Sequence, residues 1–323
     1  METMRLNRKF LYWGVFLVAV GAVLVTADLN GVDETSLADW LRLWPLAVVA
    51  LGLGLVLRRT RFNVAGGMLA AAVPGLVLGG AFALGPQIAV DCGTHGEPST
   101  FITRDGAFDG PARVDVTTGC GSLVVTTAPG SGWLLEAGNT ENREPSVDVT
   151  GTSLSIDSGR RGGWRGFWAG RDVWRLTLPT SAIDDLSLVV NAGEGDIDLA
   201  GAQLGRLGVT TNAGKTTLGL SDTSVSALSG TVNAGKLSIE LPAAVDLTAS
   251  VVVNAGALEV CVPDGVGLRV RHTGVFSGTS YNGLDQSGST WQSPDYGSAA
   301  HRTDLTVTVN LGNLDINPIG GCK

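Results

Sequence analysis

The 323-residue sequence has few of the residues that catalytic and metal sites require. It contains only three histidines and four cysteines. The histidines, His95, His272 and His301, lie far apart, and none has the spacing of a metal site or of a nucleophile and its base. The cysteines include no CxxC pair, which argues against a metal site. We therefore expect a protein that is not an enzyme, with no cofactor and no metal.

Basic residues are scarce in the larger part of the chain. Up to residue 90 there are seven lysines and arginines and five acidic residues, whereas the remainder carries 15 basic and 25 acidic residues, a net charge of about −10. Nucleic acid is thereby excluded as a partner, because phosphate binding requires a basic surface. The 46 glycines, together with many Thr, Val, Ser and Asp residues beyond residue 110, are typical of a β-rich chain with many turns.

Charged residues are almost absent from three hydrophobic runs near the N-terminus. The runs are Phe10–Ala27, Leu43–Leu57 and Asn63–Leu84. A membrane-spanning helix needs about 20 apolar residues, so the middle run spans a membrane only if Leu41 and Arg42 extend it. Otherwise it forms a re-entrant or buried helix. The sequence predicts an N-terminal α-helical transmembrane region of three helices over residues 1–90.

The basic residues around these runs are unevenly distributed. They precede the first run or fill the turn between the second and third runs: Arg5, Arg8, Lys9, Arg58, Arg59 and Arg61. The positive-inside rule then places the N-terminus in the cytoplasm and everything after Leu84 outside the cell membrane. A signal-peptidase site at Val25–Ala27 would remove the first run without changing the orientation of the rest. We expect a multi-pass protein with an extracytoplasmic C-terminal domain.

All four cysteines follow the last hydrophobic run: Cys92, Cys120, Cys261 and Cys322. An even number on the outer side fits an oxidising compartment, in which disulfides persist. Four cysteines allow three pairings. Pairing Cys92 with Cys120 and Cys261 with Cys322 would join neighbours along the chain.

The motif Asn-Ala-Gly recurs every 21 residues in the second part of the chain. Its four copies begin and end at Asn191 and Gly193, Asn212 and Gly214, Asn233 and Gly235, and Asn254 and Gly256. Apolar and polar residues alternate on both sides of each copy, as in strands that bury one face. Asn and Gly accept the positive φ angles of a sharp corner. The repeat predicts an all-β domain, a β-solenoid whose stacked asparagines can hydrogen-bond; a sandwich built from hairpins is the alternative.

Three weaker copies extend the array. They are Gly119-Cys120-Gly121, Thr150-Gly151-Thr152 and Asn310-Leu311-Gly312. The predicted organisation is therefore a transmembrane region at 1–90, a linker at 91–110 and an extracytoplasmic β-solenoid domain at 111–323.

One segment, which we name the Arg–Trp segment, interrupts the repeat from Ser158 to Trp174. Its candidate binding residues are Arg160, Arg161, Trp164, Arg165, Phe167, Trp168 and Arg171. Arginine and tryptophan commonly anchor interfaces and lipid-headgroup contacts. The segment is thus a candidate for binding the membrane surface, an envelope polymer or a partner protein. The alternative is that its aromatics cover the end of the solenoid. A second irregular stretch, Gly274 to Asp304, is expected to pack its own aromatics in a structural role.

The sequence resembles two known families. LYWGVFLVAVGAVLV and LWPLAVVALGLGLVLRR, followed by a Gly-rich third run, resemble the LiaI/LiaF-type membrane region of bacterial envelope-stress proteins. VVNAGEGDIDL and TVNAGKLSIEL resemble the adhesin-like, or toast-rack, β-domain often joined to that region. Together the resemblances cover nearly the whole chain.

This resemblance implies a non-enzymatic sensory or regulatory protein of the cell envelope. The implied partners are membrane lipid and a membrane histidine kinase or another envelope protein. A surface adhesion or scaffold module without a signalling role is the alternative. Gly75 and Gly79 offer a small-residue packing face, so a homo-oligomer is a further hypothesis.

Overall fold

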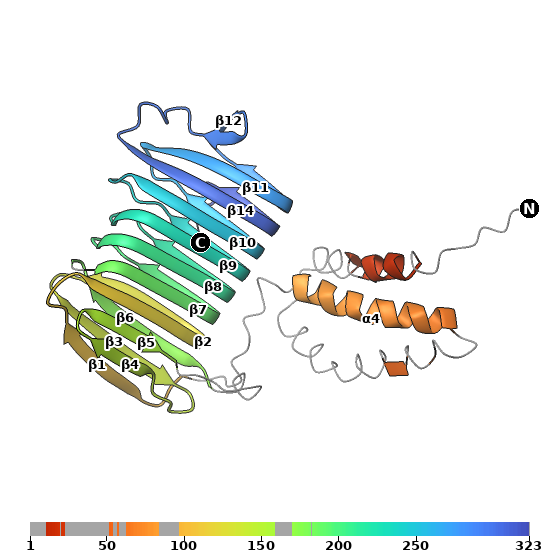
Figure 1. The fold of residues 1–323 in the computed structure, drawn as a ribbon, viewed down its shortest axis with the longest axis horizontal. Helices are drawn as coiled ribbons and strands as arrows, with labels where there is room; N and C mark the ends of the chain where they lie inside the picture. Colours follow the sequence, from red (N-terminus) through yellow and green to blue (C-terminus); the bar gives the residue numbers. More distant parts are fainter. Residues whose placement is uncertain are drawn as a thin grey trace, which may run out of the picture. The chain divides into compact units, whose positions relative to one another are not determined.

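The computed structural model describes residues 11–19, 21–22, 52–53, 57, 63–83, 97–158, 170–181 and 183–322. The chain divides into two compact units, Met1–Gln87 and Ile88–Lys323. Each unit is considered by itself below (Figure 1).

In the first unit, two helical segments pack together at glycines. Helix α4 (Asn63–Ala83) coincides with the third hydrophobic run, and residues 11–19 are helical within the first run. A Cβ atom at Gly67 would overlap the ring of Tyr12, and a Cβ atom at Gly75 would lie 2.6 Å from the backbone oxygen of Phe16. Glycine at both positions lets the two helices approach closely. The helix face that carries Gly75 therefore packs against residues 11–19 of the same chain.

Other features of the first unit lie largely outside the described residues. These include most of the second hydrophobic run and the arginine turn at Arg58, Arg59 and Arg61. Among the residues that are described, no helix is both long enough and apolar enough to cross a membrane.

The second unit is all-β and its strands join in one sheet of 14 strands. The strands are β1 (Phe101–Ala107), β2 (Ala112–Ala128), β3 (Gly132–Asn139), β4 (Ser146–Thr150), β5 (Ser153–Asp157), β6 (Asp172–Pro179), β7 (Ile183–Asp198), β8 (Gln203–Gly219), β9 (Ser224–Glu240), β10 (Leu247–Cys261), β11 (Val266–Tyr281), β12 (Asp285–Ser287), β13 (Thr290–Gln292) and β14 (His301–Ile316).

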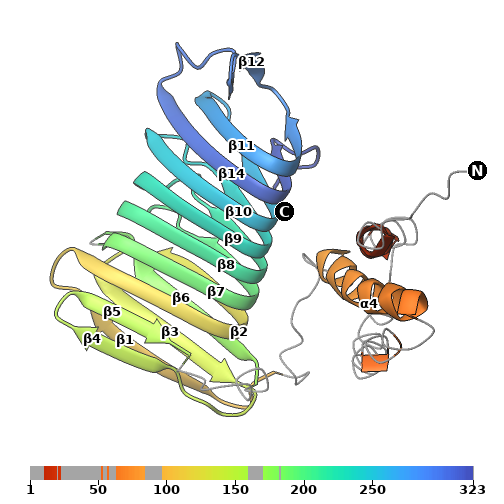
Figure 2. The same cartoon turned by 45° about the vertical axis from the view of Figure 1, so that its right-hand side comes forward.

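The long strands β2, β7, β8, β9, β10, β14 and β11 lie parallel in this order, and we call them the stack. From β7 to β10, paired residues are 21 positions apart, as in the row Leu186, Leu207, Leu228 and Ala249. Figures 1 and 2 show the long strands as curved bands lying side by side. The Asn-Ala-Gly motif therefore occupies the same position in four successive strands.

Apolar side chains on both sides of each corner form the core of the stack. In β7, Leu186, Leu188 and Val190 precede the corner, Ile197 follows it, and all four are at most 2% exposed. Ser187 and Val189, which alternate with the three residues before the corner, point outward, because side chains alternate along a strand. Burying one such aliphatic side chain stabilises the fold by roughly 1.5–3 kcal/mol.

The corners form two columns along the stack. The corner glycines, such as Gly193 and Gly214, have φ between +113° and +150°. A Cβ atom on Gly214 would overlap the carbonyl oxygen of Gly193. The corner glycines of the other neighbouring strands from β2 to β14 are packed in the same way, and we call each repeat unit of the stack a coil. Beside them runs an asparagine ladder, whose Nδ2···Oδ1 hydrogen bonds are Asn212 to Asn191 (2.6 Å), Asn233 to Asn212 (2.5 Å), Asn254 to Asn233 (2.7 Å) and Asn310 to Asn254 (2.9 Å). The expected hydrogen bonding between stacked asparagines is confirmed.

At the β2 end, the stack is completed by shorter strands. Strand β5 pairs in parallel with the first half of β2, and β6 pairs with the second half. Two of our expectations are wrong here. Thr150-Gly151-Thr152 is not a coil corner but the turn of the antiparallel β4–β5 hairpin, since its strands are too short to wrap around the core. Residues 101–107, expected in a linker, form β1, which pairs with β3 and extends the sheet.

At the other end, the last strand is inserted out of sequence order. Strand β14 lies between β10 and β11 and pairs in parallel with both. The corner at Asn310-Leu311-Gly312 has the predicted character, with Gly312 at φ +141°. Within Gly274–Asp304, the rings of Tyr281 and Trp291 stack with centroids 4.3 Å apart. The stretch thus packs its own aromatics, as expected.

Cys261 and Cys322 form a disulfide, which is one of the neighbour pairings considered from the sequence. Cys120 is also disulfide-bonded, whereas Cys92 lies outside the described residues. The bridge attaches the C-terminal tail to the outward side of β10.

Candidate functional site

The Arg–Trp segment leaves the stack at a corner. Strand β5 ends at Asp157, opposite Thr117, and β6 begins at Asp172, opposite Gly121. In the neighbouring strand β7, the three residues Val190, Asn191 and Ala192 span the same gap. Fourteen residues, 158–171, therefore separate β5 from β6 at a level where β7 has three residues.

Hydrogen bonds fix the point at which the segment returns. Asn139 Nδ2 donates to Asp172 Oδ1 at 2.7 Å, and both residues are at most 3% exposed. The Arg171 backbone N–H donates to Thr140 Oγ1 at 2.9 Å, and the Thr140 N–H donates to the Arg171 carbonyl at 3.1 Å. A buried carboxylate is stable only when it is hydrogen-bonded. The base of the segment is thus held by a polar cluster on β3 and β6.

Most of the predicted binding residues lie outside the described residues. These are Arg160, Arg161, Trp164, Arg165, Phe167 and Trp168. Arg171 is described and is exposed beside the base. Trp174, which we had counted in the segment, belongs to β6 and is 1% exposed in the core. The segment is therefore shorter than predicted, because alternation along β6 turns Trp174 inward.

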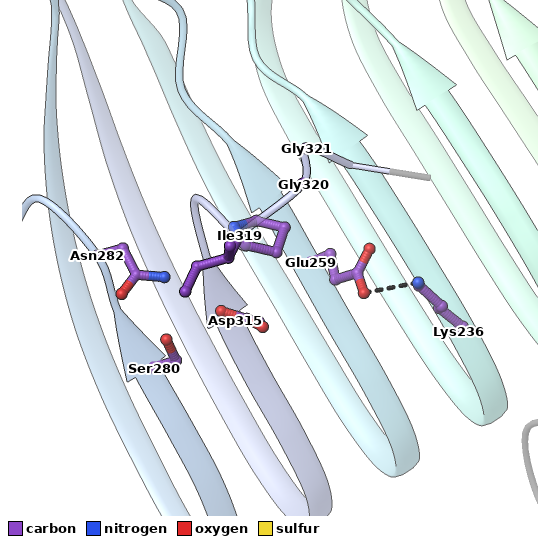
Figure 3. Close-up of a pocket in the computed structure, with 9 residues that line it drawn as sticks. Lys236, Glu259, Ser280, Asn282, Asp315, Ile319, Gly320 and Gly321 are labelled. Carbon is purple, nitrogen blue, oxygen red and sulfur yellow. Dashed lines mark ion pairs between the residues drawn. The ribbon is translucent and has the colours of Figure 1, made fainter.

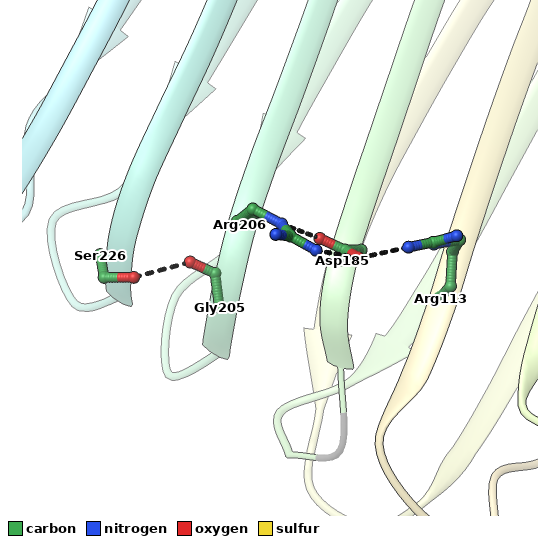
Figure 4. A network of polar contacts seen from close by, with 5 residues as sticks. All are labelled: Arg113, Asp185, Gly205, Arg206 and Ser226. Carbon is green, nitrogen blue, oxygen red and sulfur yellow. Dashed lines mark hydrogen bonds and ion pairs between the residues drawn. The ribbon is translucent and has the colours of Figure 1, made fainter.

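A charged network crosses the outward side of the stack at the start of the strands. Asp185 on β7 lies between Arg113 on β2 and Arg206 on β8, with N–O distances of 2.8 and 2.5 Å (Figure 4). Hydrogen bonds from Arg206 and Arg113 hold the pKa of Asp185 well below its ordinary value. The same bonds raise the pKa of both arginines. The next pair of strands is joined at this level by Ser226 Oγ donating to the Gly205 carbonyl at 2.8 Å. These contacts link each strand from β2 to β9 in the stack to the next one.

A cavity of about 440 Å³, which we name the tail pocket, lies on the outward side of the stack near the C-terminus. It is lined by Lys236, Glu259, Ser280, Asn282, Asp315, Pro318, Ile319, Gly320 and Gly321. Figure 3 shows the tail residues passing over the strands that carry Asp315 and Glu259. Lys236 and Glu259 form an ion pair of 2.6 Å within the pocket.

A second hollow, of about 400 Å³, is lined by residues of β10, β14, β11 and the loop before β14. Its Arg269 pairs with Asp304 at 2.6 Å and stacks on Tyr296, with 4.7 Å between guanidinium carbon and ring centroid. Tyr296 in turn donates to Asp304 at 3.2 Å, and burial raises the pKa of its hydroxyl. The main charged groups of this hollow therefore contact one another.

Within the described parts of the chain, no group of three or more His, Cys, Asp or Glu side chains is arranged to hold a metal ion. His301 lies 3.8 Å from Asp246, and His272 faces Tyr281 with ring centroids 6.4 Å apart. Burial lowers the pKa of His272. The third histidine, His95, is outside the described residues.

Two family models together account for most of the sequence. Residues 98–260 match the N-terminal domain of toast_rack, DUF2154, which is half of the chain. Residues 12–96 match the LiaF transmembrane domain. The chain belongs to the toast-rack family. The resemblance drawn from the sequence is confirmed, and the LiaF match indicates that the N-terminal part of this toast-rack protein is membrane-associated.

Solved structures similar to this toast-rack protein come from bacteria. A proposed cell adhesion protein of Clostridium sporogenes is 16% identical, with a TM-score of 0.47, over 67% of this chain and 98% of that one. A proposed adhesin of Bacteroides fragilis is 13% identical, with a TM-score of 0.29, over 68% and 97%. A proposed lipid binding protein of Parabacteroides distasonis is 13% identical, with a TM-score of 0.30, over 68% and 97%. No curated protein matches the sequence.

Sequence reasoning missed two sites that the toast-rack domain assembles. Asp185 and Arg206 are 21 residues apart, so the repeat itself could have paired them. Asp315 was not recognisable, because it approaches Glu259 only through the insertion of β14 next to β10.

Proposed function

We propose that this chain is a non-enzymatic, membrane-anchored regulatory protein of the bacterial envelope. In this proposal, three N-terminal helices span the cell membrane, the N-terminus is cytoplasmic and the β-solenoid of 21-residue coils lies outside. The Arg–Trp segment binds an anionic component of the envelope. The match to the LiaF transmembrane domain and the toast-rack family supports the anchored arrangement.

The observation that supports the proposal is the position of the strand ends that flank the Arg–Trp segment. A corner that elsewhere needs three residues is here replaced by residues 158–171, whose base is held by the buried pair of Asn139 and Asp172. Four arginines and several aromatic residues are concentrated there, in a part of the chain with net negative charge. Guanidinium groups bind carboxylates and phosphates in two-point contacts, and aromatic rings add buried contact area.

The test replaces Arg160, Arg161 and Arg165 with Ser in the full-length protein. The matched control replaces three exposed arginines elsewhere, Arg104, Arg271 and Arg302. Binding is measured to vesicles with and without phosphatidylglycerol and to isolated cell walls. We expect the first variant to lose anion-dependent binding and the control to keep it. Equal binding by both variants would reject the segment as the site.

The Arg–Trp segment could instead bind a partner protein, and the same variants test this alternative. Crosslinking in native membranes followed by identification of the bound proteins would detect a membrane histidine kinase or another envelope protein. Altered kinase signalling on deletion supports the regulatory function, whereas lost surface attachment with unchanged signalling supports an adhesion or scaffold module. Protease applied to intact cells should reach the domain beyond residue 90 if it is extracytoplasmic.

A further inference from the structure

Six outward positions in the second halves of the long strands form one row across the stack. In order, they are Asp196, Thr217, Ser238, Glu259, Asp315 and Ser280. Neighbouring strands are about 4.8 Å apart, so Asp315 lies directly between Glu259 and Ser280. The row places two carboxylates side by side on the floor of the tail pocket.

The two carboxylates differ in how they are satisfied. Glu259 accepts from Lys236 at 2.6 Å through one oxygen and from Ser238 Oγ at 3.1 Å through the other. Asp315 Oδ1 is completely buried, and within the described residues it has no hydrogen-bond partner. Among the described residues, Lys236 is the only basic residue that lines the pocket, and it forms an ion pair with Glu259. A buried carboxylate oxygen without a hydrogen-bond donor destabilises the fold.

The wall above Asp315 is the C-terminal tail, and it is firmly attached. Asn317 N–H donates to the Val260 carbonyl at 2.8 Å, and Asn317 Oδ1 accepts from the Val262 N–H at 2.9 Å. The disulfide from Cys322 to Cys261 fixes the far end. Between these two attachments Ile319 is 99% exposed, so an apolar side chain stands uncovered at the rim of a polar pocket.

These features fit a ligand with a cationic end and an aliphatic body. A primary ammonium group has three N–H donors, which match the Asp315 carboxylate and the hydroxyl and amide oxygens of Ser280 and Asn282. An alkyl chain would lie against Ile319. A metal ion fits less well, because Lys236 already occupies one of the two carboxylates. The net negative charge of the domain attracts cations to the pocket.

We propose that the tail pocket binds a primary alkylammonium group, with Asp315 as its counter-ion and the disulfide-tethered tail as its wall. Amines of this kind occur on diamino acids and on aminoacyl or aminoalkyl esters. The site is separate from the Arg–Trp segment, so the variant with Arg160, Arg161 and Arg165 replaced is expected to keep it.

The experiment is calorimetric titration of the full-length protein in detergent micelles at pH 7. The probes are n-pentylammonium and the neutral 1-pentanol. We expect pentylammonium to bind at least about tenfold more tightly than pentanol, as for one charge-assisted hydrogen bond. Asp315→Asn should remove most of this preference. Asp196→Asn is the matched control, because it removes the same charge from the same row outside the pocket and should change nothing.

Two further variants keep the test decisive if Asp315→Asn disturbs folding. Ser280→Lys brings an ammonium group next to Asp315 and should abolish binding while thermal unfolding remains cooperative. Cys322→Ser frees the tail and should weaken binding. Equal affinity for both probes would overturn the proposal, as would full binding by Asp315→Asn or by Ser280→Lys.

Discussion

Asn212 and Asn191 are joined side chain to side chain, with Asn212 Nδ2 donating to Asn191 Oδ1 at 2.6 Å across 21 residues of sequence. From Asn191 to Asn254, each asparagine donates its amide N–H toward the strand before it in the stack and accepts through its oxygen from the strand after it. One residue type at one position therefore satisfies both ends of the contact. The ladder connects neighbouring coils at the one point where the backbone turns sharply.

Removal of an inner member should break two of these bonds at once. We expect Asn233→Ala to lower the free energy of unfolding by about 1–2 kcal/mol, since it leaves the Asn254 donor and the Asn212 acceptor without a partner. Urea denaturation followed by circular dichroism measures the loss. Ser229→Ala, at an exposed outward position of the same strand, should change stability by less than about 0.5 kcal/mol. Equal effects of the two variants would contradict a structural role for the ladder.

The glycine column should tolerate no side chain. Gly214 and Gly130 have similar φ angles of +122° and +116°, but a Cβ atom overlaps the Gly193 carbonyl oxygen only at Gly214. We expect Gly130→Ala to cost about 1–3 kcal/mol from backbone strain, and Gly214→Ala about 4–5 kcal/mol or more. The difference between their unfolding free energies isolates the contact between coils. Similar losses of unfolding free energy in the two variants would mean that neighbouring strands can move apart at the corner to accept a Cβ atom.

Trp174 should act as a core residue and not as part of a binding segment. It is 1% exposed, so Trp174→Ala should lower the free energy of unfolding by about 3–5 kcal/mol. Leu134, on the adjacent strand β3, is 39% exposed, and Leu134→Ala should cost about 1 kcal/mol or less. Chemical denaturation of both variants provides the comparison. A small loss at Trp174 would argue against its buried position.

The stability provided by Asp185 should depend on pH. Its pKa is depressed in the folded chain, so its contribution is complete above about pH 4, the value in the unfolded chain, and is lost as the pH falls toward the folded pKa. The Tm difference between the wild type and Asp185→Asn should therefore be largest near neutral pH and shrink below pH 4. It should also shrink in 1 M salt, which screens exposed charges. Asp196→Asn, which replaces an exposed carboxylate, serves as the control. Its Tm should stay close to that of the wild type both near neutral pH and below pH 4.

The disulfide should stabilise the domain as well as the tail pocket. Cys261 and Cys322 enclose a loop of 61 residues, and replacing both with Ser should cost about 2–4 kcal/mol. Guanidinium denaturation under non-reducing conditions measures this loss, and mass spectrometry confirms that Cys120 stays disulfide-bonded. A double variant as stable as the wild type would show that the tail adds nothing to the fold.

The sequence by itself determined the Asn-Ala-Gly corners, the alternation of buried side chains and the pairing of Asn191 with Asn212. A fixed period makes identical residues fall opposite one another as soon as parallel strands stack, so the register follows from local spacing. The resemblance to the toast-rack β-domain rested on the same repeat. The tertiary structure alone decided the positions of Trp174 and Asp315. Strand β14 is inserted between β10 and β11, and β5 and β6 share one level of the stack. Such pairings join segments at irregular separations, and their free energy comes from edges and core that exist only once the rest of the stack has formed.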